Sequence, residues 1–73
     1  MPQLPVISGR EARRAFEKIG WVFSRQKGSH MILGKSGVPM NLSIPDHRPL
    51  DRGTLRGLIR HAGLTVEQFL ELL

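Results

Sequence analysis

The sequence predicts an α+β fold in which helices cover one face of a three-stranded antiparallel sheet, giving two layers. Three observations support this class. Apolar residues recur at helical spacing near both ends of the chain, residues typical of strands fill the middle, and glycine-containing turns separate the strand segments. The predicted order is α-β-β-β-α-α. The 73 residues are expected to form a single domain, 1–73, around one core.

The first helix is expected to follow an extended N-terminal arm, Met1–Ile7, which contains two prolines. Ser8 and Glu11 form a capping box at the start of this helix, and Gly20 ends it. The face opposite its apolar stripe is basic, which is typical of a solvated surface or of a secondary contact with RNA or a partner. The basic residues are Arg10, Arg13, Arg14 and Lys18.

Three strands are predicted over residues 21–26, 29–33 and 38–44, with turns at 27–28 and 34–37. The turn lengths predict the strand pairing. The pairs expected in the first hairpin are Arg25 with His30 and Phe23 with Ile32. The pairs expected in the second hairpin are Met31 with Met40 and His30 with Asn41.

This pairing assigns one face of the sheet to the core and leaves the other open. The predicted core face contains Val22, Met31, Leu33, Val38, Met40 and Leu42. The predicted open face contains Phe23, Arg25, His30, Ile32 and Asn41. Trp21 and Phe23 would stack RNA bases if they lay exposed there, unless Met1–Ile7 covers them.

A polar loop over residues 44–49, with a proline near each end, precedes two further helices. Asp51 is expected to cap the second helix and Gly63 to end it. Thr65 and Gln68 form a capping box for the third helix.

The charge distribution indicates a polyanionic partner. Residues 1–63 contain eleven basic and four acidic side chains, a net charge of +7, and the two glutamates of the remaining segment lower the total to +5. Because phosphate contacts release counterions, we favour nucleic acid as the partner, with an acidic protein surface as the alternative. The chain has no cysteine, no recognisable signal peptide and no apolar run of membrane-spanning length, which favours a cytoplasmic protein without membrane contact.

Two familiar site patterns do not fit the sequence. Gly34-Lys35-Ser36 resembles part of a P-loop, but Ser29 stands where that motif needs glycine, and the segment lies in a hairpin. Lys35 stays a candidate phosphate contact. The histidines and carboxylates show no metal-ligand spacing, so we expect neither a metal nor another cofactor. His61, close to a helix C-terminus, is interpreted as a partner of the helix dipole.

His30 is the candidate catalytic residue. RNA cleavage without a metal needs a base for the 2′-hydroxyl, an acid for the leaving oxygen and positive charge near the phosphate. An imidazole can serve as base or acid near neutral pH, and Arg25, Lys27 and Lys35 are candidates for the charge. His47 is a candidate second proton-transfer group or, equally, a loop residue that orders the turn.

Three sequence blocks together carry a family resemblance. They are Gly28-Ser29-His30 followed by apolar residues, Ile44-Pro45-Asp46-His47, and the segment 53–64. In their order and spacing the chain resembles the HicA (YcfA-like) family of toxins, small mRNA interferases of bacterial and archaeal toxin–antitoxin pairs. His61 stands where the family commonly has glutamine, outside the proposed chemistry.

The resemblance implies a double-stranded-RNA-binding-like fold, endoribonuclease activity on mRNA and neutralisation by a HicB-type antitoxin. It places the catalytic histidine at His30, with Gly28 and Ser29 as its neighbours. We therefore expect the RNA-binding residues Arg25, Lys27, Ser29 and Lys35 around it. Two other functions stay open from the sequence: a non-catalytic RNA-binding module of the same fold, and a small adaptor for an acidic protein.

Overall fold

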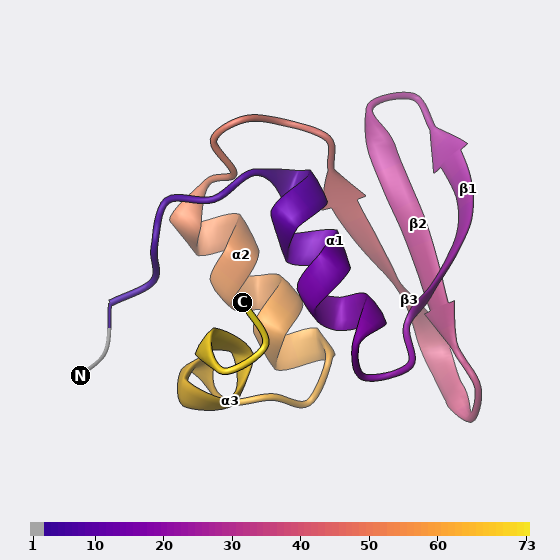
Figure 1. Cartoon of the computed structure of the whole chain (residues 1–73). Coiled ribbons are helices and arrows are strands. Elements are labelled where there is room, and N and C mark those ends of the chain that lie inside the picture. The colour runs from indigo at the N-terminus through magenta and orange to yellow at the C-terminus, as the bar shows by residue number, and fades with distance from the viewer. Residues whose placement is uncertain (1–2) are drawn as a thin grey trace.

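A three-stranded antiparallel sheet, in the order β1-β2-β3, forms one layer of the molecule, and the helices form the other (Figure 1). The computed structural model describes residues 3–73. The predicted α+β class and element order are confirmed. The elements are α1 (Gly9–Glu17), β1 (Val22–Lys27), β2 (His30–Lys35), β3 (Val38–Pro45), α2 (Arg52–His61) and α3 (Val66–Leu70).

The helices begin where the capping signals predicted. Ser8 and Glu11 satisfy each other's backbone N–H groups with their side-chain oxygens, over 3.0 and 3.1 Å. Thr65 and Asp51 accept hydrogen bonds from the first turns of α3 and α2, over 3.1 and 3.0 Å. Because such side-chain bonds replace the partners that a first turn lacks, each helix start is fixed by residues close in sequence.

The predicted pairing of the first hairpin is wrong. Lys27, not Arg25, pairs with His30, and the two-residue turn is Gly28-Ser29. Gly28 takes φ +59°, which suits the first central position of a hairpin turn with glycine there. A bulge between Phe23 and Arg25 then pairs Phe23 with Leu33 instead of Ile32. Because of the bulge, the residues before it, Val22 and Phe23, lie on the faces of the sheet opposite to those predicted.

The predicted pairing of the second hairpin is also wrong, by four residues. His30 pairs with Pro45 and Met31 with Ile44. The turn consists of Ser36-Gly37 alone, because β2 continues to Lys35, and the register shifts between Leu33 and Lys35. Since a displacement by four residues preserves the alternation of side chains, His30 still lies on the predicted face.

The core lies between the sheet and the helices, and two predicted members are not in it. Val22 is 66% exposed because the bulge turns it outward, and Met40 is 58% exposed in the hairpin end that extends past α1 (Figure 1). The largest fully buried side chains are Phe16, Phe69, Leu4, Met31, Leu33, Leu42, Ile44, Leu55 and Ile59.

The N-terminal arm packs into this core and does not cover the open face of the sheet, the surface turned away from the helices. Leu4 and Ile7 are buried, and the Leu50 N–H donates to the Ile7 carbonyl over 2.7 Å. Met1 and Pro2 lie outside the described residues. The described part of the arm, residues 3–7, therefore leaves the face with His30 uncovered.

Candidate functional site

His30 is the first residue of β2, directly after the Gly28-Ser29 turn, and its side chain is exposed. Its Nδ1 atom lies 3.2 Å from Ser43 Oγ, across the neighbouring strand β3. Ser43 was not predicted from the sequence. Because this contact engages Nδ1, the other ring nitrogen, Nε2, is the atom that can exchange a proton with a bound molecule.

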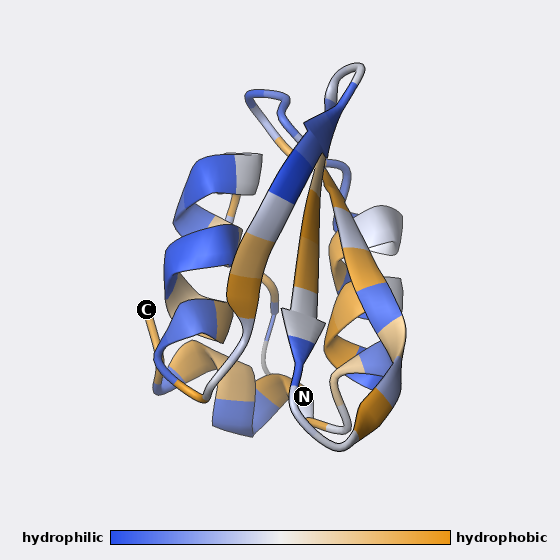
Figure 2. Cartoon of the chain, turned by 90° about the vertical axis from the view of Figure 1, so that its right-hand side faces the viewer, coloured by the Kyte–Doolittle hydropathy of each residue, from blue (hydrophilic) through white to orange (hydrophobic). Residues whose placement is uncertain are grey.

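Two of the predicted RNA-binding residues lie on β1 beside His30. Lys27 is its direct partner, and Arg25 follows two residues along the same face, opposite Ile32. Figure 2 shows the hydrophilic stretch at this end of β1, against the hydrophobic colour of the other end. Asn41, expected next to His30, is replaced there by Ser43 and Pro45 because of the changed register.

The other two predicted RNA-binding residues occupy different places. Ser29 lies in the exposed turn directly before His30. Lys35 ends β2, so it is five residues from His30 along the strand, roughly 16 Å at the usual rise of a β-strand. The structure therefore brings Arg25, Lys27 and Ser29 together with His30 and leaves Lys35 at the opposite end of the sheet.

Trp21 and Phe23 do not form a stacking surface, because neither is exposed on the open face as that role would require. Trp21 is 3% exposed and belongs to the core. The bulge turns Phe23 toward the helix layer, where the Arg13 guanidinium lies 4.1 Å from the centre of its ring. A stacked cation and ring of this kind hold each other in place.

The first turn of α1 is fixed to the same end of the sheet as His30. The Asp46 N–H donates to the Ser29 carbonyl over 2.7 Å. The Asp46 carboxylate accepts two hydrogen bonds from Arg10, over 3.1 and 3.2 Å. These bonds and the charge of Arg10 hold the pKa of Asp46 below its ordinary value. Asp46 thus joins the turn before His30 to α1.

Gly9 makes this junction possible, and sequence reasoning missed it. Its N–H donates to the His47 carbonyl over 2.9 Å. A Cβ atom at Gly9 would collide with the Pro45 carbonyl oxygen. The only signal in the sequence is a glycine in the first helical turn, next to a capping serine, where most residue types would be accepted.

His47 lies on the loop after β3, two residues beyond Pro45, the strand partner of His30. Its side chain is exposed and lines a surface pocket of about 550 Å³ together with Arg10, Arg14 and Arg48. The structure therefore brings the loop of the second candidate histidine to the His30 end of the sheet.

Residues 3–73 contain neither a metal-binding cluster nor a membrane-spanning helix. No three histidine or carboxylate side chains come close enough together there to bind a metal ion. None of the helices within this described part of the chain is both long and apolar enough to cross a membrane.

A comparison with family models matches residues 9–64 of the chain to the model described as the HicA toxin of bacterial toxin–antitoxin systems. A comparison with curated proteins found no match. The matched segment runs from the first residue of α1 past the end of α2. It includes the Gly28-Ser29 turn, His30, Ser43 and the loop with Asp46 and His47.

Proposed function

Because this chain belongs to the HicA toxin family of bacterial toxin–antitoxin systems, we propose that it is a metal-independent endoribonuclease that cleaves mRNA with His30 as its catalytic residue. The observation that carries the proposal is the position of His30. It is an exposed imidazole on the open face of the sheet, with one nitrogen held by Ser43 and a lysine directly opposite.

The proposed reaction is an attack of the RNA 2′-oxygen on the adjacent phosphorus. The P–O5′ bond breaks, and the products are a 2′,3′-cyclic phosphate and a 5′-hydroxyl. His30 removes the proton from the 2′-hydroxyl or donates one to the leaving 5′-oxygen. His47 is the candidate for the complementary transfer, since its loop follows the strand partner of His30.

Cationic side chains beside His30 are proposed to hold the reacting phosphate. Lys27 and Arg25 share its face of the sheet, and they would stabilise negative charge that grows on the phosphate oxygens. Ser29 offers a hydroxyl and a backbone N–H in the turn. Lys35, at the far end of β2, would contact a more distant part of the RNA backbone.

A HicB-type antitoxin in the same cytoplasm is the proposed protein partner. The open face is the part of the molecule that it would have to cover to keep mRNA away from His30. The described N-terminal segment, residues 3–7, does not cover this face, because Leu4 and Ile7 are buried in the core between the sheet and the helices.

The test compares His30→Ala with His61→Ala. Both residues are exposed, and His61 lies in the last turn of α2, so the second variant controls for loss of a surface imidazole. We expect His30→Ala to lower RNA cleavage in EDTA by at least about 100-fold, the usual range for a general acid or base. Its fold and RNA affinity should be unchanged, and induced expression should no longer arrest growth.

Two results would contradict the proposal. One is full cleavage by purified His30→Ala protein. The other is wild-type protein that binds RNA but never cuts it, which would favour the non-catalytic RNA-binding module.

A further inference from the structure

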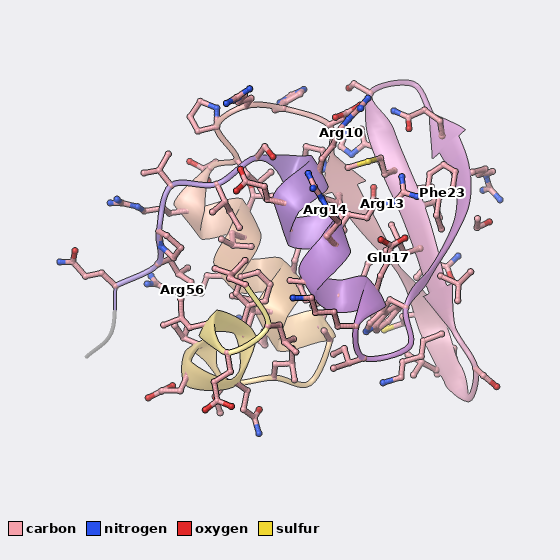
Figure 3. The ribbon with its side chains drawn as sticks, viewed as in Figure 1. Arg10, Arg13, Arg14, Glu17, Phe23 and Arg56 are labelled. Atoms are coloured by element: carbon pink, nitrogen blue, oxygen red, sulfur yellow. The ribbon has the colours of Figure 1, made fainter. Side chains whose placement is uncertain are left out.

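A second group of basic side chains lies near the His30 end of the sheet, at the start of α1. Arg10 and Arg14 lie along one side of α1 (Figure 3), and His47 and Arg48 follow β3 on the adjoining loop. Together with Ser8, they line the pocket of about 550 Å³, which is called the basic pocket below. Guanidinium groups from two different segments thus converge on one hollow.

The two carboxylates at the basic pocket, Asp46 and Glu11, offset only part of the charge of its three arginines. Asp46 is bound by Arg10, and Glu11 is bound to Ser8 in the capping box. Arg14 and Arg48 form no ion pair among residues 3–73. Their charges nevertheless act on Glu11, whose pKa is lowered first by its bond with the Ser8 backbone and further by these two arginines. Two guanidinium groups therefore remain for a ligand.

The end of the helix itself offers little to that ligand. The Glu11 N–H donates to Ser8 Oγ, the Ala12 N–H to the Ser8 carbonyl, and the Gly9 N–H to the His47 carbonyl. Binding would therefore depend on the side chains. A guanidinium presents a planar fork of N–H donors that fits phosphate oxygens, and Arg10 is already held in place by its two bonds to Asp46.

The position of the basic pocket connects it to His30. Asp46, at its edge, donates its backbone N–H to the carbonyl of Ser29, the residue before His30. An RNA strand bound at His30 on the open face can therefore continue over the Gly28-Ser29 turn toward α1. This continuity favours RNA over an acidic protein segment as the occupant.

We propose that the basic pocket is a phosphate-binding subsite for the RNA strand, which holds a backbone phosphate that flanks the one cut at His30. Arg14 and Arg48 are its main ligands, and Arg10 forms its wall. The inference rests on the proposed function in one respect, namely that the bound phosphate flanks the one cut at His30. The binding of an RNA phosphate in the basic pocket can be tested without cleavage.

The test uses the full chain and the double variant Arg14→Ala/Arg48→Ala. This double variant is made both in the wild-type protein and in the His30→Ala protein. The matched control is Arg56→Ala/Arg60→Ala, which removes two exposed arginines of α2 outside the basic pocket. Figure 3 shows Arg56 at the left of the molecule, away from the sheet. Affinity for a labelled single-stranded RNA is measured by fluorescence anisotropy in the His30→Ala background, at salt concentrations from about 50 to 200 mM. Circular dichroism verifies the fold of each variant.

We expect the pocket variant to bind RNA about tenfold or more weakly. The slope of log affinity against log salt concentration should become less steep by about 1.4. Each phosphate contact with a single strand contributes roughly 0.7, and the variant lacks two. In the wild-type background its KM for RNA should rise with kcat little changed, as for a contact made equally before and during reaction. The control should retain the wild-type slope and KM.

Equal losses in the pocket variant and the control would overturn the inference, because the effect would then be one of overall charge. So would unchanged RNA binding combined with lost binding of a polyglutamate peptide, which would assign the basic pocket to a protein partner. If the wild-type protein never cleaves RNA but the pocket variant alone loses affinity, the subsite stands and the nuclease proposal fails. If the protein cleaves RNA and the two double variants behave alike, only the subsite fails.

Discussion

At the scale of single residues, the environment of His30 depends on the turn before it and on one hydroxyl group across the sheet. Gly28 closes the turn in two residues, so His30 begins β2 at the end of the sheet and stays exposed. Ser43 then contacts Nδ1 over 3.2 Å. A partner on one ring nitrogen orients the imidazole, so Ser43 is a positioning residue in the proposed reaction.

Ser43→Ala is therefore expected to lower kcat for RNA cleavage by roughly three- to tenfold, which corresponds to the loss of one hydrogen bond. KM and RNA affinity should change little. Ser43→Thr, which keeps the hydroxyl and suits a strand, should restore most of kcat. Ser24→Ala, an exposed serine of β1, is the control. Steady-state cleavage measures kcat and KM of all four proteins, and an unchanged kcat for Ser43→Ala would remove its positioning role.

The sequence was sufficient to predict the face on which His30 lies, but not its neighbours. The alternation of side chains assigns each residue to a face of the sheet. The predicted register of the second hairpin differs from the observed one by an even number of residues, so the face assigned to His30 is still correct. Ser43 could not be found because contact across the sheet depends on register itself. The preference of glycine for the first position of some two-residue turns was the signal that would have moved the first turn to Gly28-Ser29.

At the scale of elements, α1 and β3 touch through backbone with no side chain between them. Gly9 places the first turn of α1 against the Pro45 carbonyl, and its N–H donates to His47. The Arg10–Asp46 ion pair sits on the same junction. Any atom inserted between the two backbones must move the helix away from the end of the sheet where His30 lies.

Gly9→Ala is therefore expected to destabilise the protein by about 1–3 kcal/mol, as usual for overpacking, despite the better helix propensity of alanine. Gly57→Ala is the matched control, since a Cβ atom at Gly57 in α2 meets nothing within 4 Å. That variant should gain about 0.5–1 kcal/mol from the reduced freedom of the unfolded chain. Urea unfolding of the three proteins measures both changes. A neutral or stabilising effect of Gly9→Ala would show that the two elements are not in close contact.

Helix boundaries were predictable and strand irregularities were not, for the same physical reason. A capping box such as Ser8 with Glu11 is complete within four residues, whereas the bulge at Phe23 depends on what lies beneath the strand. There, Phe23 packs against the core and the Arg13 guanidinium stacks on it. The prediction that Phe23 is an open-face aromatic failed because tertiary packing, not local alternation, decides its direction.

At the scale of the whole molecule, acidic side chains lie outside the sheet, whereas basic side chains occur in both layers. No acidic residue occurs between residues 18 and 45, which include all three strands. The acids that precede the C-terminal segment are held in helix caps or ion pairs: Glu11, Glu17, Asp46 and Asp51. The sheet therefore presents cations without compensating carboxylates, as expected for a surface that binds a polyanion.

The same arrangement predicts how stability depends on pH. The pKa of Asp46 is lowered by its bonds with Arg10, and the pKa of Glu11 is lowered by its bonds with Ser8. Both carboxylates therefore bind a proton less readily in the folded than in the unfolded protein. Their contribution to stability is complete above the ordinary carboxyl range and is lost as the pH falls through their lowered folded pKa values.

We accordingly expect the free energy of unfolding to be nearly constant from about pH 7 to 5 and to decline below about pH 4, where carboxyl groups titrate. Asp46→Asn should reduce the steepness of this decline, while Glu71→Gln, in the C-terminal segment, should leave it unchanged. Because Arg10 is exposed, the Arg10–Asp46 contribution should shrink as salt is added. Urea midpoints across pH at low and high salt measure these effects. An Asp46→Asn curve that parallels the wild type would show that the ion pair joining α1 to the His30 end of the sheet does not persist in solution.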